Sequence, residues 1–206
     1  MYFKNNKSAL DNSEFVDQAV SELVDSGCVY KVPFIPYVVN PLSVATNKSG
    51  KKRLILDLSV LNKFAKKQKF KFEDWKLAIQ FFKEDSYLYK FDLRSGYHHF
   101  DICPQQQTYL GFSWNGKYCC FTVLVFGLSS SPYLFTKCLR EMVKYWRKNA
   151  IKIVLYLDDG FGMSDSFEKC QKDSFFVKQS LVDAGFFINE KKSIFVPTQK
   201  LKVLLG

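Results

Sequence analysis

Two adjacent carboxylates follow an apolar, β-branched run in the second half of the chain. The run Ile153–Leu157 leads directly into Asp158, Asp159 and Gly160. Like charges about 4 Å apart repel one another unless a cation neutralises them. Carboxylate oxygens are hard ligands that suit Mg²⁺ or Mn²⁺. The pair therefore predicts either a divalent metal site or a solvated hairpin turn, because Asp and Gly are also common turn residues.

A third carboxylate, Asp92, ends another predicted strand that begins at Ser86. If that strand lies beside the strand leading to Asp158 in one antiparallel sheet, the strand ends bring three carboxylates close together. Two-metal phosphoryl or nucleotidyl transfer requires such a cluster: one ion activates an attacking hydroxyl and the other stabilises the leaving oxygen.

The elements that must position these acids alternate between helices and antiparallel hairpins. Asn115-Gly116 predicts a tight hairpin turn, and Ser131 as N-cap with Pro132 in the first turn predicts the start of a long helix. Helical periodicity further predicts helices at 11–26, 74–82 and 166–184. Strands are expected at 42–46, 53–58, 86–92, 109–114, 117–123, 151–156, 161–163, 193–196 and 201–205. Because no regular βαβ order appears, the expected class is α+β.

Composition favours a folded chain with a polyanionic partner. Hydrophobic residues make up 47% and aromatic residues 17% of the 206 residues, which excludes a disordered polymer. The net charge of +10 favours nucleic acid. Lysines cluster at 48–53 and, interleaved with aromatics, at 63–71, a pattern typical of a surface that follows a phosphate backbone. A solvated loop is the other interpretation of the second cluster.

The cysteines and the termini indicate where the protein works. The six cysteines show neither Cys-x-x-Cys nor zinc-finger spacing, so mostly buried, reduced thiols are expected. The polar N-terminus lacks a signal-peptide pattern, and the longest apolar run, 118–128, is too short to span a bilayer. We expect an intracellular protein, cytoplasmic or nuclear, without a membrane partner.

The order of several motifs resembles the reverse transcriptase domain of retroelements. The motifs are Phe91-Asp92-x4-Tyr97, Phe126-Gly127-Leu128-Ser129-Ser130-Ser131-Pro132 and Tyr156-Leu157-Asp158-Asp159, preceded by Arg53–Asn62. The resemblance extends over about 28–206. Among retroelements it is greatest to tyrosine-recombinase (DIRS-type) retrotransposons, and the residues at 71–75, 96–99 and 156–160 indicate this subfamily.

The resemblance implies an α+β fold of right-hand polymerase fingers and palm, with an antiparallel palm sheet packed on helices. An N-terminal helical segment would occupy 1–27. The fingers would occupy about 28–85 and 109–123, and the palm 86–108 and 124–206. The thumb is expected to be absent, with truncation before it, so the chain would be part of a Pol polyprotein with thumb, RNase H and recombinase.

The resemblance also implies the reaction: an RNA-directed DNA polymerase core that adds deoxynucleotides to a DNA primer on an RNA or DNA template. Asp92, Asp158 and Asp159 would bind two Mg²⁺ ions, with Mn²⁺ as a substitute. Main-chain groups after Asp92, at Leu93, would hold phosphate oxygens of the deoxynucleoside triphosphate. Arg53 would contact the triphosphate, helped by Lys48 or Lys51.

Three further positions would shape the nucleotide pocket. Tyr97 would exclude a 2′-hydroxyl by its bulk, although an ordinary core tyrosine is the alternative. Phe126 would pack near the new base pair, and Gly127 would leave room for the backbone.

The C-terminal part would supply a proton donor and a primer contact. Lys192 resembles the family lysine that would protonate pyrophosphate; Lys191 could take that role, and a solvated lysine pair is the other interpretation. Leu205 and Gly206 match the beginning of the primer-grip hairpin. His98 and His99 lack spaced metal-ligand partners, so a structural role is expected. The alternative function is a non-catalytic nucleic-acid-binding remnant, and a telomerase or retron polymerase is a third option.

Overall fold

The computed structural model describes residues 1–66, 68, 83 and 85–200, which belong to two compact units. The first unit is formed by 1–67 and 97–131, and the second by 68–96 and 132–206. Each unit combines helices with a sheet, so the predicted α+β class is confirmed. The expected fingers and palm boundaries stay predictions, because contacts group residues without showing which polymerase lobe they form.

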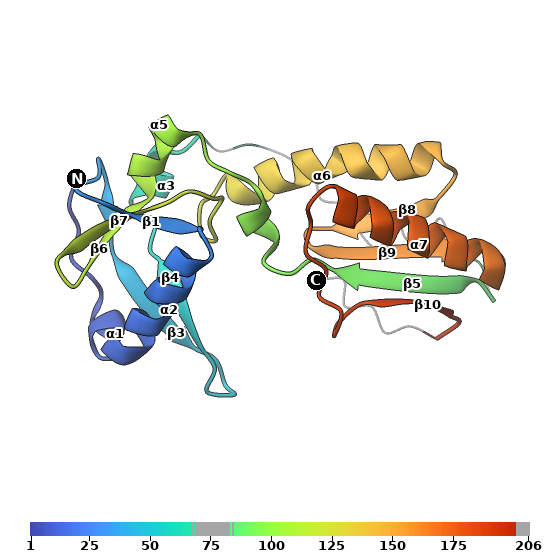
Figure 1. Cartoon of the computed structure of the whole chain (residues 1–206), viewed down its shortest axis with the longest axis horizontal. Coiled ribbons are helices and arrows are strands. Elements are labelled where there is room, and N and C mark those ends of the chain that lie inside the picture. The colour runs from blue at the N-terminus through green and yellow to red at the C-terminus, as the bar shows by residue number, and fades with distance from the viewer. Residues whose placement is uncertain (67, 69–82, 84, 201–206) are drawn as a thin grey trace. The chain divides into compact units, whose positions relative to one another are not determined.

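The first unit holds a four-stranded sheet in the order β1-β7-β6-β2 and a separate hairpin, β3-β4 (Figure 1). In the sheet, β2 pairs parallel with β6 and the other pairs are antiparallel. Its strands are β1 (Val29–Val32), β2 (Val39–Asn40), β3 (Leu42–Thr46), β4 (Lys52–Leu56), β6 (Gly111–Trp114) and β7 (Lys117–Phe121). Its helices are α1 (Lys7–Leu10), α2 (Ser13–Asp25), α3 (Leu61–Phe64), α5 (Pro104–Gln107) and η2 (Thr108–Leu110), and η1 (Gly96–His99) begins at the unit border.

Both hairpins of this unit form where the sequence predicted them. In the β6-β7 turn Asn115 and Gly116 have φ angles of 48° and 73°, the left-handed values that a type I′ turn needs. At the tip of β3-β4 the Asn47 Oδ1 accepts main-chain N–H groups of Ser49 and Lys51 at 3.1 and 2.8 Å. The side chain of Asn47 therefore closes the basic tip together with two main-chain hydrogen bonds, from Asn47 N–H to the Lys51 carbonyl and from Gly50 N–H to the Asn47 carbonyl, each at 3.0 Å.

The first unit's core lies between α2, the sheet and the β3-β4 hairpin. Val16 of α2 and Phe112 of β6 are fully buried in one apolar cluster. The helix ends where predicted, because Gly27 adopts a φ of 74° that favours glycine. The short helix α1 was not predicted from the sequence.

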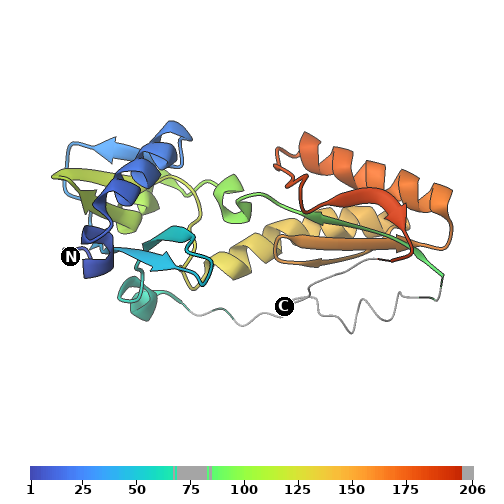
Figure 2. The same cartoon turned by 90° about the horizontal axis from the view of Figure 1, so that it is seen from below.

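The second unit holds an antiparallel sheet in the order β10-β5-β9-β8 with two long helices along one side (Figures 1 and 2). The strands are β5 (Tyr87–Asp92), β8 (Lys152–Tyr156), β9 (Asp159–Ser164) and β10 (Ile194–Thr198), and the helices are α6 (Ser131–Lys148) and α7 (Phe167–Asp183). Trp146 of α6 is fully buried: its Nε1 donates to Ser180 Oγ of α7 at 2.7 Å, and its ring meets Phe91 of β5 edge-on. These contacts join both helices to the sheet.

Glycines let large rings cross the middle of this sheet. A Cβ added at Gly160 would lie 2.1 Å from the Phe91 ring, and one added at Gly162 would lie 2.2 Å from the Tyr89 ring. Both pairs are register partners across β5 and β9. Only glycine leaves room for these rings, so β9 and β5 fit together through the Gly-Phe-Gly sequence of β9.

Several local predictions need correction. Ser131 is the first residue of α6, and its Oγ donates to the Val125 carbonyl at 2.7 Å, with no N-cap bond observed. Leu134 and Cys138 follow the apolar helical period of α6, yet both are exposed, as is Phe167 at the start of α7. The predicted helix at 74–82 and strand at 201–205 lie outside the described residues.

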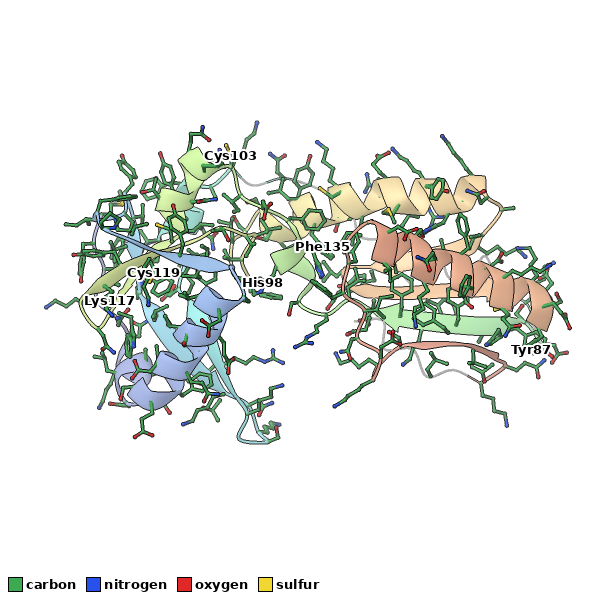
Figure 3. The ribbon with its side chains drawn as sticks, viewed as in Figure 1. Tyr87, His98, Cys103, Lys117, Cys119 and Phe135 are labelled. Carbon is green, nitrogen blue, oxygen red and sulfur yellow. The ribbon has the colours of Figure 1, made fainter. Side chains whose placement is uncertain are left out.

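The cysteines of the chain are free thiols. Cys119, Cys120 and Cys170 are buried, whereas Cys103 and Cys138 are exposed, so only part of the set matches the expected burial. Figure 3 shows Cys103 and Cys119 on separate elements of the first unit. Across the described residues, no helix is both long and apolar enough to traverse a bilayer.

Candidate active site

The carboxylates meet at one end of the second unit's sheet. Asp92, the last residue of β5, is the register partner of Asp159, the first residue of β9. Tyr87, labelled in Figure 3, begins β5 at its opposite end. The prediction that the Asp92 strand lies beside the strand leading to Asp158 is wrong, because β9 separates β5 from β8. The acids still come together, since the β8-β9 turn brings Asp158 back to the end of β5, where Leu93 N–H donates to its carbonyl at 2.9 Å.

The turn itself is one residue earlier than predicted. Leu157 and Asp158 form the loop, and Asp159 already pairs with Tyr156. Leu157 has a φ of 52°, a left-handed value that is uncommon for a residue with a branched side chain. Asp159 thereby gains a fixed strand position opposite Asp92, while Asp158 lies at the tip.

Burial and mutual repulsion raise the pKa of both turn acids. The pKa of Asp158 lies above its ordinary value because the carboxylate is partly desolvated and because Asp92 is negative nearby. The pKa of Asp159 is raised by desolvation first, then by Asp158 and Asp92. Three acids therefore share one poorly solvated site, and a cation would lower its electrostatic energy.

Asp92 is the most enclosed of the three acids, with 6% of its surface exposed. Its Oδ1 accepts from Asn189 Nδ2 at 2.8 Å, and its Oδ2 accepts from Lys192 Nζ at 3.1 Å. The hydrogen bond to Asp92 raises the pKa of Lys192, with smaller contributions from the charges of Asp92, Asp159 and Asp158. Lys192 therefore supplies a positive charge beside the acids.

The chemistry of the donor set suits a hard divalent cation, because three carboxylates from two strands and a turn lie at one end of the sheet. Across residues 1–66, 68, 83 and 85–200, however, no three His, Cys, Asp or Glu side chains are grouped closely enough to hold one ion. Lys192 and Asn189 already occupy both oxygens of Asp92. Each carboxylate oxygen keeps a second lone pair, but the Lys192 ammonium repels a cation at Oδ2, so cation binding is favoured when Lys192 releases Asp92 Oδ2.

The predicted pocket residues Tyr97, Phe126 and Gly127 lie together in the first unit. The Tyr97 and Phe126 ring centroids are 4.6 Å apart, and 59% of Phe126 is exposed. Gly127 has a φ of 89°, and Asn62 holds its loop on both sides: Asn62 Nδ2 donates to the Gly127 carbonyl at 2.7 Å and Asn62 Oδ1 accepts from Ser129 N–H at 2.8 Å. Tyr97 is thus part of an aromatic surface that reaches solvent.

The predicted phosphate-binding cations lie on the β3-β4 hairpin. Lys48 and Lys51 belong to its exposed tip, and Arg53 of β4 is exposed opposite Ala45. These residues belong to the first unit, and the carboxylates belong to the second. The predicted primer contacts Leu205 and Gly206 lie outside the described residues.

The histidines have packing partners in the first unit. His98, labelled in Figure 3, lies with Nδ1 3.8 Å from Cys28 Sγ and with its ring edge-on to Phe126. Burial lowers the pKa of His98, and the neighbouring His99 adds to the effect. A neutral, packed His98 is in keeping with the expected structural role.

Comparison with known proteins identifies the family. The family model described as "Reverse transcriptase (RNA-dependent DNA polymerase)" matches residues 45–204. This chain belongs to the reverse transcriptase family. The match contains Asp92, Asp158 and Asp159, so the acid cluster lies inside this reverse transcriptase domain.

Relatives of this reverse transcriptase domain are polyproteins. A polyprotein of Cassava vein mosaic virus is 28% identical over 157 residues, which are 76% of this chain and 23% of that protein. The Pol polyprotein from the transposon opus of Drosophila melanogaster is 26% identical over 189 residues, 89% of this chain and 18% of that protein. The chain thus spans less than a quarter of either relative.

Solved structures support the same fold. The foamy viral protease-reverse transcriptase in complex with dsDNA superimposes with a TM-score of 0.78 at 24% identity, over 95% of this chain and 39% of that one. The selenomethionine-labelled prototype foamy virus enzyme gives a TM-score of 0.77 at 22% identity, over 94% of this chain and 25% of that one. The arrangement of helices and antiparallel sheets is that of polymerase fingers and palm.

Sequence reasoning missed Asn62 and Asn189, the two asparagines that brace the site regions. Asn62 is the last residue of the Arg53–Asn62 motif, and Asn189 lies three positions before Lys192. Polar contacts that span 65, 67 and 97 positions leave no periodic signal in the sequence, so the partners of both asparagines became visible only in the fold.

Proposed function

We propose that this reverse transcriptase domain is the core of an RNA-directed DNA polymerase that adds deoxynucleotides to a DNA primer by two-metal nucleotidyl transfer. The observation that carries the proposal is the Asp92–Asp159 register pair, which Asp158 joins through the β8-β9 turn. A solvated turn would need no third acid on the neighbouring strand.

In this proposal Asp92, Asp158 and Asp159 hold the cations. Mg²⁺, or Mn²⁺ in its place, would supply the Lewis acidity that activates the primer hydroxyl and stabilises the leaving pyrophosphate. Lys192 holds a proton beside Asp92 and would donate it to the departing pyrophosphate; its contact with Asp92 favours it over Lys191. The main-chain N–H of Leu93 donates to the Asp158 carbonyl and so orients the β8-β9 turn. The proposed contact with the phosphate oxygens would therefore use another main-chain group after Asp92.

The first unit would select and hold the nucleotide. The Tyr97–Phe126 pair offers an exposed aromatic surface for a sugar and a base, and Gly127 would leave room for the backbone to approach. Arg53, with Lys48 or Lys51, would neutralise triphosphate charge. Exclusion of a 2′-hydroxyl by Tyr97 would make deoxynucleoside triphosphates the preferred substrate.

The relatives support a proposal for the nucleic-acid ligands and the polyprotein context of this domain. Foamy viral relatives have been solved in complex with dsDNA and with RNA/DNA hybrid, and we propose the corresponding template-primer duplexes as ligands here. Curated relatives are polyproteins, so we propose that this domain works within a Pol polyprotein. The DIRS-type assignment, with a tyrosine recombinase in the same element, is a proposal that sequencing of the flanking genome would test.

Primer extension tests the proposed reaction. The domain, expressed with the rest of its Pol polyprotein, should extend a DNA primer on an RNA template only when Mg²⁺ or Mn²⁺ is added. Asp158→Asn should reduce the rate about a thousandfold or more, since loss of a metal ligand removes several kcal/mol of transition-state stabilisation. The matched control Asp165→Asn removes an exposed carboxylate paired with Lys152 and should keep the wild-type rate. Equal rates for wild type and Asp158→Asn would contradict the proposal.

A binding-only remnant is the second candidate, and one observation favours it. Lys48 and Lys51 lie on an exposed hairpin tip, where they could bind a phosphate backbone without any use of the acid cluster. That function predicts equal duplex binding by wild type and Asp158→Asn, with no extension by either.

A further inference from the structure

One five-residue segment surrounds Asp92 from the main chain to the carboxylate. Asn189 N–H donates to the Asp92 carbonyl at 2.9 Å, and Asn189 Nδ2 donates to Asp92 Oδ1 at 2.8 Å. Asp92 N–H donates to Ser193 Oγ at 3.1 Å, and Lys192 Nζ donates to Asp92 Oδ2 at 3.1 Å. Every polar group of Asp92 therefore has its partner in the segment Asn189–Ser193.

The segment is held rigid where it meets Asp92. The N–H groups of Lys192 and Ser193 both donate to the Asn189 carbonyl at 3.0 Å, which closes the segment into a turn. Before it, Ile188 forms an antiparallel bridge with Leu93, and Arg94 N–H donates to the Phe187 carbonyl at 2.8 Å. The main-chain N–H, the main-chain carbonyl and the side chain of Asn189 are thus all held by hydrogen bonds.

The two partners of the Asp92 carboxylate differ in kind. Lys192 is a charged and flexible side chain with 67% of its surface exposed, so it competes with a cation for Oδ2 and can withdraw into solvent. The Asn189 amide is uncharged, so it donates to Oδ1 without opposing a cation nearby. A hydrogen bond of this kind orients a ligating carboxylate and leaves its other oxygen for the metal.

We infer that Asn189 is a positioning residue that fixes the Asp92 carboxylate through Oδ1 and so presents Oδ2 to a divalent cation. The inference rests on the proposed function, because it assigns Asp92 to a cation site. The inference assigns a role to Asn189 of the segment Asn189–Ser193: this residue does not bind the cation, yet the cation affinity of the site depends on it.

Binding of Mn²⁺ alone to the 206-residue chain tests this inference, with free Mn²⁺ measured by electron paramagnetic resonance. Asn189→Ala should weaken Mn²⁺ binding about 10–100-fold, the usual effect of losing a hydrogen bond to a ligating side chain. Ser193→Ala is the matched control, because it removes a bond to the Asp92 main chain and leaves both carboxylate contacts intact. Ser193→Ala should weaken Mn²⁺ binding far less than Asn189→Ala does, although the two variants should lose a similar amount of thermal stability. If Asn189→Ala unfolds, Asn189→Leu keeps the side chain's shape without the donor.

The outcomes separate the inference from the proposed function. If wild type binds Mn²⁺, Asp92→Asn does not, and Asn189→Ala binds like wild type, the positioning role is overturned while the metal site stands. Equal weakening in Asn189→Ala and Ser193→Ala would also overturn it, because the segment would then act only through structure. If wild type and Asp92→Asn bind Mn²⁺ equally, the proposed metal site itself is contradicted.

Discussion

At the scale of single residues, the acid cluster costs stability until a cation arrives. Asp158 and Asp159 have raised pKa values in the folded protein, so the fold binds their protons more tightly than the unfolded chain does. Their charges therefore destabilise the fold above the raised pKa, and this penalty fades as the pH falls towards the ordinary value of 3.8. The acid cluster thus lowers the stability of the cation-free fold and at the same time favours the binding of a cation.

Thermal unfolding without divalent cations checks this sign. At pH 7, Asp158→Asn should raise the Tm by about 2–4 °C, the shift that ~1 kcal/mol gives in a chain of this size. The difference between variant and wild type should shrink as the pH is lowered towards 4. Adding Mn²⁺ should reverse the order, since wild type then gains binding energy that the variant lacks. A variant less stable than wild type at pH 7 without cations would contradict the assignment.

At the scale of elements, the sheet of the second unit depends on glycines that lie under aromatic rings. Gly160→Ala should destabilise the protein by about 1–3 kcal/mol, because the new methyl group would overlap the Phe91 ring. Phe91→Leu should lower stability by itself, yet the double variant should lose less than the sum of the two, since the smaller side chain makes room. Chemical denaturation of the four proteins measures this coupling, and strict additivity would show that the ring and glycine do not meet.

The same elements show how far sequence reasoning reaches. The strands ending in Asp92 and before Asp158 were predicted from apolar runs, and Asn115-Gly116 predicted its hairpin through turn chemistry. Strand order was not predicted, because a hydrophobic pattern locates a strand without naming its neighbours. The turn was predicted one residue late, because Asp and Gly favour turns whereas leucine rarely takes the positive φ that Leu157 has here. The Asn189–Asp92 contact depends on the folded chain and had no local signal.

At the scale of the whole molecule, the charge of +10 should make nucleic-acid binding depend steeply on salt. Lys48→Ala and Lys51→Ala remove cations from the exposed hairpin tip, and each should reduce the slope of log affinity against log salt by about 1 if the lysine contacts a phosphate. Lys172→Ala, an exposed lysine of α7, is the control and should leave the slope unchanged. The measurement is the affinity for an RNA/DNA hybrid between about 50 and 200 mM salt. Equal slopes for wild type and all variants would exclude the hairpin tip from the nucleic-acid interface.

The central claim is that Asp92, Asp158 and Asp159 form a cation site at one end of the second unit's sheet. Anomalous diffraction from crystals of the chain soaked in MnCl₂ tests it most directly. The account predicts a manganese peak about 2.0–2.6 Å from carboxylate oxygens of Asp92 and Asp158, with Lys192 Nζ moved away from Asp92 Oδ2. Peaks confined to other carboxylates, with the Lys192–Asp92 contact unchanged at 3.1 Å, would contradict it.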